Sequence, residues 1–196
     1  MNVGVLPFNV SNMYIDSNGD IYAGSPTSGF FFSTDNGNTW SSAGSTVNKG
    51  NALLRDKSGR LYAYHFGGLY RSTDNGNSWQ EKDDGISGLA INSFVTLPNS
   101  AVLAATSRGM VRSLDQGQTW SLSTSGLLQS TNALAKRSDG TVFAAAERGV
   151  YNSTDGGVTW SSIGLSDYRA TSISVSTAGR IFAGVTQKRG GFLLQD

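Results

Sequence analysis

The chain contains no cysteine and only one histidine, His65. The lack of cysteine excludes disulfide bonds, thiolate nucleophiles and cysteine-based metal sites. No arrangement of Ser and Asp accompanies the single histidine as a nucleophilic triad would require, so a position at the surface or at a rim is the simpler interpretation of His65. We therefore expect neither a metal nor a cofactor.

Charged residues are also scarce, at 15% of the chain, and glutamate occurs only twice, at Glu81 and Glu147. The net charge of +1 gives no field that would attract nucleic acid or an anionic membrane. The 25 glycines argue against a helical protein, because glycine costs about 1 kcal/mol at a helix position.

Long apolar runs are missing as well. No stretch approaches the roughly 18 apolar residues of a membrane helix, and Met1–Val10 shows no export signal, so we expect no membrane insertion. The many Ser, Thr, Asn and Gly residues suit a secreted or surface protein, but the sequence assigns no compartment.

The sequence does contain a motif of eight residues that occurs four times. Each copy follows the pattern Ser-x-Asp-x-Gly-x-Thr/Ser-Trp, in residues 33–40, 72–79, 113–120 and 153–160. Successive tryptophans of the motif are 39, 41 and 40 residues apart, and the four copies use every tryptophan in the chain. Recurrence at this period indicates a repeat architecture.

Each unit of about 40 residues contains four short strand patterns separated by turn residues. One strand of each unit carries a recurring alanine, at Ala23, Ala63, Ala104, Ala144 and Ala183. Four strands in a unit of this length are typical of one blade of a β-propeller. We therefore predict an all-β propeller that occupies residues 1–196 as a single domain.

The fifth unit has only three strand patterns, in residues 171–175, 179–184 and 191–194. Residues Val3–Phe8 have the phase of the missing fourth strand. We expect residues 1–10 to complete the last sheet, which gives five four-stranded blades in a closed, monomeric ring without free sheet edges. The alternative is a fragment of a longer propeller that pairs with other chains.

The repeated motif resembles the Asp-box, or bacterial neuraminidase repeat (BNR), in four of the five units. The resemblance implies a turn between the third and fourth strands of a blade, whose Asp accepts backbone hydrogen bonds and whose Trp packs between neighbouring blades. Asp, Gly and Trp suit these roles physically. We expect the following residues to be structural: Asp35, Trp40, Asp74, Trp79, Asp115, Trp120, Asp155 and Trp160. Catalysis and calcium binding are the alternatives for the acids, but the loops lack the distal Glu of a hand-type calcium loop.

Asp-box propellers include sialidases, xyloglucan-cleaving glycosidases, sortilin-like receptors and assembly factors similar to Ycf48, so the fold leaves the function open. A sialidase-like site implies three arginines, a Tyr with a Glu partner and an Asp, on a longer six-bladed domain. The Arg-Ile-Pro signature of that family is absent, and Arg180-Ile-Phe does not replace it. Xyloglucan-type enzymes build their paired-carboxylate cleft between two propellers. We therefore expect no enzyme, with a glycoside hydrolase as the alternative.

Propellers usually bind ligands at the loops between the second and third strands and at the connections between blades. Asparagines recur there where inner strands begin, and they either satisfy backbone groups or recognise a hydroxyl-rich ligand. Arginines at this end either form a solvated rim or bind an anionic ligand or a protein surface, and aromatic side chains can stack on sugars. The candidate binding residues are Asn51, Asn92, Asn132, His65, Phe66, Arg108, Arg148, Arg189 and Tyr168.

These observations predict a nonenzymatic binding or scaffold propeller. Its ligand is either a glycan, as in lectins, or a docked protein. A duplicated or designed propeller without an evolved ligand is the remaining alternative.

Overall fold

The structure, a computed structural model, describes residues 9–10, 12–16, 18–25, 27–42, 52–65 and 67–186. All the regular elements in these ranges are β-strands, so the all-β prediction is confirmed. Within the same ranges no helix could span a membrane.

The strands group into four sheets of four and one of two, which we call blades 1 to 5. Blade 1 is β1 (Asn12–Ile15), β2 (Ile21–Ser25), β3 (Gly29–Ser33) and β4 (Ser41–Ser42); blade 2 is β5 (Ala52–Arg55), β6 (Leu61–His65), β7 (Gly68–Ser72) and β8 (Gln80–Glu81). Blade 3 is β9 (Ile91–Thr96), β10 (Val102–Thr106), β11 (Gly109–Ser113) and β12 (Ser121–Leu122); blade 4 is β13 (Thr131–Lys136), β14 (Val142–Ala146), β15 (Gly149–Ser153) and β16 (Ser161–Gly164). Blade 5 is β17 (Ala170–Val175) and β18 (Ile181–Val185).

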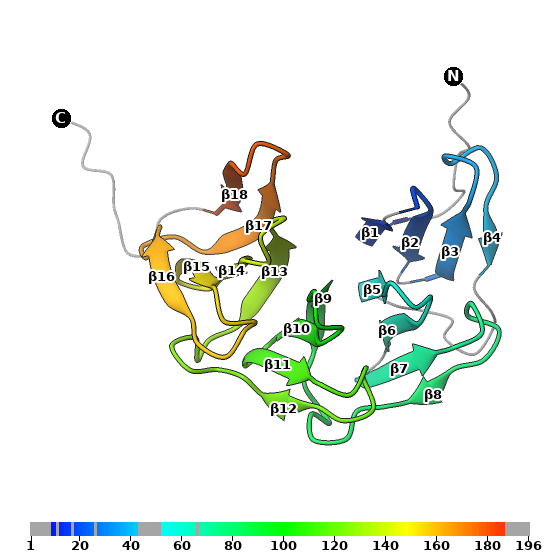
Figure 1. Ribbon diagram of the computed structural model, residues 1–196, viewed down its shortest axis with the longest axis horizontal. Coiled ribbons are helices and arrows are strands. Elements are labelled where there is room, and N and C mark those ends of the chain that lie inside the picture. The colour runs from blue at the N-terminus through cyan, green and yellow to red at the C-terminus, as the bar shows by residue number, and fades with distance from the viewer. Residues whose placement is uncertain are drawn as a thin grey trace.

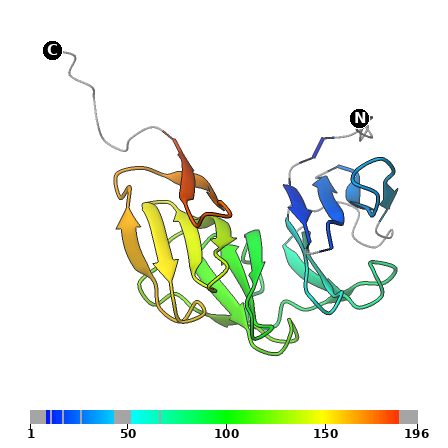
Figure 2. The same ribbon diagram turned by 45° about the horizontal axis from the view of Figure 1, so that its top comes forward.

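Every blade is an antiparallel meander whose strands pair in chain order. The first strands of successive blades contact one another in the order β1, β5, β9, β13, β17 and line the inside of an arc (Figure 1). Figure 2 shows the same arc from another side, with blade 1 in blue at one end and blade 5 in orange and red at the other. The blades therefore have the radial arrangement of a propeller.

The hydrophobic core lies between neighbouring blades. Trp120, the last residue of the motif in blade 3, is buried in one cluster with Leu54 and Tyr62 of blade 2. Trp160 of blade 4 shares another cluster with Leu103 of blade 3. The recurring alanine of the second strand is fully buried in blades 1 to 4, where only a small residue leaves room for such packing.

Apolar side chains stay at the surface at both ends of the arc. Phe182 on β18 is 58% exposed, whereas Phe143 at the equivalent place in blade 4 is 2% exposed. At the other end, Ile15 on β1 is 63% exposed. The predicted closing strand, Val3–Phe8, lies outside the described residues, so closure of the ring stays a prediction.

Candidate functional site

The repeated motif forms the turn between the third and fourth strands in blades 1 to 4. In blade 3, the Ser113 hydroxyl donates to Oδ1 of Asp115 (2.7 Å), and the Gly117 amide donates to Oγ of Ser113 (2.7 Å). Thr119 completes the turn: its amide donates to Oδ1 of Asp115 (2.9 Å) and its hydroxyl to Oδ2 (2.6 Å). The same pattern surrounds Asp35, Asp74 and Asp155.

These hydrogen bonds keep the motif carboxylates charged. The hydroxyl and amide of Thr39, followed by the Ser33 hydroxyl, lower the pKa of Asp35 to about 2. For Asp115, burial acts to raise the pKa, but the hydrogen bonds from Thr119 and Ser113 outweigh it and lower the pKa to about 2. A carboxyl group this acidic holds no proton near neutral pH, so it is unsuited to general acid catalysis.

Each sheet has two ends that differ in their loops. We call the end with the motif turns the box face, and the end with the loops between the second and third strands the loop face. The connections between blades reach the loop face as well, because the strands are antiparallel. Backbone hydrogen bonds join these segments, from the Ser107 amide to the Ala90 carbonyl and from the Glu147 amide to the Ser130 carbonyl, both at 2.9 Å.

Asn92 and Asn132 stand near the beginnings of β9 and β13 on the loop face. Nδ2 of Asn92 donates to the carbonyl of Thr131 (2.8 Å), the first residue of the next inner strand. Nδ2 of Asn132 donates in the same way to the carbonyl of Ala170 (2.7 Å). Each amide thus donates a hydrogen bond from one blade to the next.

Two shallow hollows on the loop face share the side chain of Leu128. One, of about 350 Å³, also has Arg108 and Leu122 in its lining. The other, of about 420 Å³, has Arg148 and Tyr151. Leu128 is 82% exposed. The structure therefore brings two of the candidate arginines to the two sides of an exposed leucine that the sequence did not single out, since one leucine in a connection gives no pattern.

Tyr168, another candidate that the structure describes, does not line either hollow. Tyr168 lies half-buried in the turn before β17, where its amide donates to the Leu165 carbonyl (2.9 Å). Asn51, Phe66 and Arg189 lie outside the described residues, and so does the side chain of His65.

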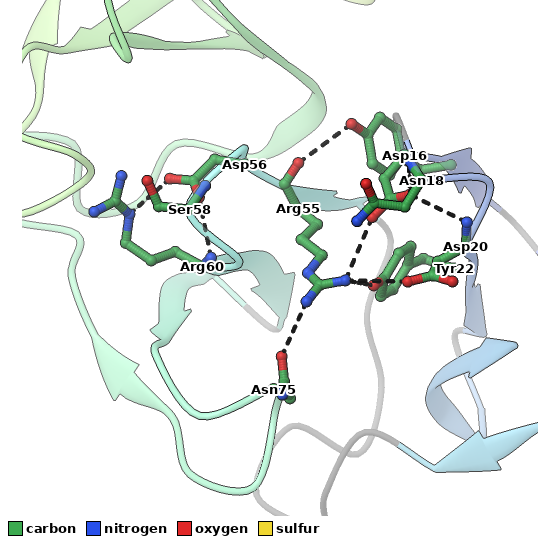
Figure 3. Close-up of polar contacts among 10 residues, drawn as sticks. Asp16, Asn18, Asp20, Tyr22, Arg55, Asp56, Ser58, Arg60 and Asn75 are labelled. Atoms are coloured by element: carbon green, nitrogen blue, oxygen red, sulfur yellow. Dashed lines mark hydrogen bonds and ion pairs between the residues drawn. The ribbon is translucent and has the colours of Figure 1, made fainter. Parts of the chain in front are cut away.

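A polar cluster on the box face joins blades 1 and 2 (Figure 3). Arg55, at the end of β5, extends toward the β1–β2 turn. Its Nη1 donates to the Tyr22 hydroxyl (2.6 Å) and contacts the carboxylates of Asp20 (3.2 Å) and Asp16 (3.4 Å). Its Nη2 donates to Oδ1 of Asn75 (3.2 Å). Sequence reasoning missed this cluster, because its members come from different units.

Asp56 forms a second polar centre beside Arg55. Its Oδ1 accepts hydrogen bonds from the amides of Ser58 (2.9 Å) and Arg60 (3.0 Å), and its Oδ2 accepts one from Nε of Arg60 (2.6 Å). The Tyr62 hydroxyl lies 3.0 Å from Oδ2 of Asp56 and 2.9 Å from the carbonyl oxygen of Gln116 in blade 3. Burial, and then the charge of Asp56, raise the pKa of Tyr62 to about 12.

A cavity of about 190 Å³ lies at the inner edge of the box face. Its lining comes from four inner strands and from the turns that follow β1 and β5, and includes Tyr14, Asp16, Arg55, Lys57, Thr96 and Lys136. Among the described residues, no group of three or more acids or histidines could hold a metal ion.

Comparisons with known proteins agree with this architecture. The family model described as BNR/Asp-box repeat matches residues 111–122, which include the motif of blade 3. No curated protein sequence matches the chain.

Among solved structures, an ancestral GH74 enzyme is similar with a TM-score of 0.76 and 24% identity, over 96% of this chain and 28% of that one. The GH74 xyloglucanase from Xanthomonas campestris is similar with a TM-score of 0.71 and 13% identity, over 94% and 34%. YCF48 bound to D1 peptide is similar with a TM-score of 0.63 and 15% identity, over 94% and 66%.

These likenesses concern the fold. The chain carries the BNR/Asp-box repeat and has a propeller-type fold, so both predictions are confirmed. It spans about a third or less of the length of these two GH74 enzymes.

Proposed function

We propose that the chain is a nonenzymatic binding module that docks a segment of another protein on its loop face. The segment carries acidic side chains and one apolar side chain that covers Leu128. The observation that carries this proposal is the position of exposed Leu128 between the hollows lined by Arg108 and Arg148.

Contact with a partner would stabilise both the exposed leucine and the two arginines of this surface. Covering apolar surface contributes about 25 cal/mol per Å², and exposed apolar surface with a polar rim is typical of interaction sites. Guanidinium groups bind carboxylates through two parallel hydrogen bonds. Among the described residues, neither Arg108 nor Arg148 takes part in an ion pair, so both are available to an acidic partner.

A glycan has less support on the same face. Nδ2 of Asn92 and Nδ2 of Asn132 each already donate one hydrogen bond to a backbone carbonyl, which leaves these amides fewer groups for recognising hydroxyls. The similar YCF48 structure contains a bound D1 peptide, which supports a peptide ligand for this chain by analogy.

Hydrolysis also has less support than binding. A glycosidase needs one carboxyl group that stays protonated near neutral pH and a second carboxylate across the same cleft. Asp16 and Asp56 line one cavity, but they are paired with Arg55 and Arg60. The pKa values of the motif aspartates are lowered, opposite to the direction that a general acid requires.

A phage-displayed peptide library and a glycan array, both probed with the intact protein, test the proposal. We expect selected peptides to combine Asp or Glu with a Leu or Phe, and their binding to weaken as salt rises. Leu128→Gln and the double variant Arg108→Gln/Arg148→Gln should each lower the affinity about tenfold or more.

Matched controls lie on the box face. Leu114 is 68% exposed, so Leu114→Gln removes a comparable exposed leucine and should bind the peptides like the parent protein. Arg180→Gln serves the same purpose for the arginines. Peptides that bind the loop-face variants as tightly as the parent, or a glycan whose binding depends on Asn92 and Asn132, would overturn the proposal.

A further inference from the structure

The cavity on the box face contains two lysines that have no acidic partner among the described residues. Lys136, at the end of β13, is half-buried, and its Nζ donates to the carbonyl oxygen of Thr96 (2.5 Å). An ammonium group has three N–H donors, so two remain. Lys57, in the β5–β6 turn, lines the same cavity. Neither lysine forms an ion pair with any residue that the structure describes.

The two carboxylates in the lining already have cationic partners. Asp16 contacts Arg55, and Asp56 contacts Arg60. The lining holds three cations, from Arg55, Lys57 and Lys136, against these two carboxylates. Two further partners, Asp20 on Arg55 and Arg60 on Asp56, carry opposite charges that cancel. One positive charge therefore remains in excess at the cavity.

The two lysines also act on each other. Burial, and then the charge of Lys57, lower the pKa of Lys136. The ammonium groups therefore repel each other across the cavity, and an anion placed between them would relieve this repulsion.

We propose that Lys57 and Lys136 form a binding site for a small oxyanion, namely a phosphate group or a carboxylate group, at the inner edge of the box face. Both ammonium groups would donate charge-assisted hydrogen bonds to its oxygens. The cavity of about 190 Å³ corresponds to roughly six water molecules at about 30 Å³ each, which is enough room for such a group. The site lies on the opposite face from Arg108 and Arg148 and does not depend on the docking function.

Isothermal titration calorimetry of the intact protein with inorganic phosphate and with malonate, at low ionic strength, tests the site. We expect saturable binding of one anion per chain for at least one of the two probes. Binding of phosphate alone points to a phosphoryl ligand, and binding of malonate alone to a carboxylate ligand. Lys57→Gln and Lys136→Gln should each weaken binding about tenfold, because each removes one charged donor.

Lys82→Gln is the matched control, since Lys82 follows β8 on the loop face, and it should bind like the parent protein. Lys57 lies in an exposed turn, so its variant keeps the test informative if Lys136→Gln does not fold. A second readout is the pKa of Lys136, followed by NMR of its side chain. The bound anion should raise this pKa. An absence of saturable binding, equal affinity in Lys57→Gln and parent, or an unchanged pKa would each overturn the site.

Discussion

At the scale of single residues, the glycine of the repeated motif has two separate constraints. Gly37 and Gly117 both have a positive φ, of 85° and 77°, a backbone conformation that residues with a side chain rarely adopt. Among the described residues, a Cβ on Gly37 would meet only Ile21 and Trp40, at 3.7 and 3.9 Å, whereas a Cβ on Gly117 would overlap the ring of Tyr62. These equivalent positions of the repeat thus have the same backbone conformation but different packing around it.

Gly117→Ala should therefore destabilise the protein more than Gly37→Ala. Both variants lose about 1 kcal/mol to backbone strain, and the first loses about 1–3 kcal/mol more to overpacking against Tyr62. Urea unfolding followed by tryptophan fluorescence measures the difference. Equal losses in the two variants would mean that the Tyr62 ring moves aside without cost.

The lowered pKa values of the motif carboxylates predict how the free energy of unfolding depends on pH. Their folded pKa of about 2 lies below the ordinary value of 3.8, so the unfolded chain takes up protons first as the pH falls. The stabilisation that the charged motif aspartates contribute is complete above about pH 5 and is lost as the pH falls from about 4 through about 2. Melting temperatures measured from pH 6 to pH 2 should show this decline, and Asp115→Asn should make it shallower. An unchanged slope in that variant would contradict the assignment.

At the scale of elements, Arg55 connects the β1–β2 turn of blade 1 to blade 2. Its side chain and those of Asp16 and Asp20 are 20%, 8% and 20% exposed. Solvent therefore screens these ion pairs less than it screens pairs at the open surface.

Arg55→Met should lower the free energy of unfolding by about 1–3 kcal/mol, between the values for exposed and buried ion pairs. Arg55→Lys should recover part of the loss, since one ammonium group cannot reach both the carboxylates and Asn75. Arg137→Met, which breaks the more exposed pair with Asp139, is the control and should cost less than about 1 kcal/mol. Equal losses in the two methionine variants would show that Arg55 does not couple the blades.

The elements themselves could be predicted from the sequence, because each arises from local patterns that recur from one unit to another. Asp115 and Gly117 mark a turn by their own chemistry, and alternating strands follow at fixed spacing. The box-face cluster could not be predicted in this way, because Arg55 meets Asp16 only after two units pack together. Leu128 was missed for a related reason: a single exposed leucine becomes informative only beside Arg108 and Arg148.

At the scale of the whole molecule, the exposed apolar side chains at the two ends of the arc indicate surfaces that need a cover. Closure by residues 1–10 predicts that blades 1 and 5 are neighbours, with packed sheets about 10 Å apart. Because the chain has no cysteine, spin labels can be placed at Met13→Cys and Phe182→Cys without background.

The distance between these labels should match that of a reference pair on adjacent blades, at Leu114→Cys and Val158→Cys. Deletion of residues 1–8 should lengthen and broaden the first distance and leave the reference unchanged. A long distance in the full chain that the deletion does not alter would exclude closure, and a short distance found only in dimers would indicate pairing between chains.

The burial of the core between neighbouring blades has a consequence for cooperativity. In such an array, stability is close to a sum of nearest-neighbour terms, so opening propagates from the units with the fewest buried contacts. The cluster between blades 4 and 5 contains only Ala145, Val150 and Ala170 as buried members among the described residues. By contrast, Leu103 and Trp160 belong to the large cluster of blades 3 and 4. Amide protons of β17 and β18 should therefore exchange with solvent first and those of β10 and β14 last. Since the loops that carry Arg108, Leu128 and Arg148 belong to blades 3 and 4, the loop-face surface would persist in molecules whose last blade has already opened.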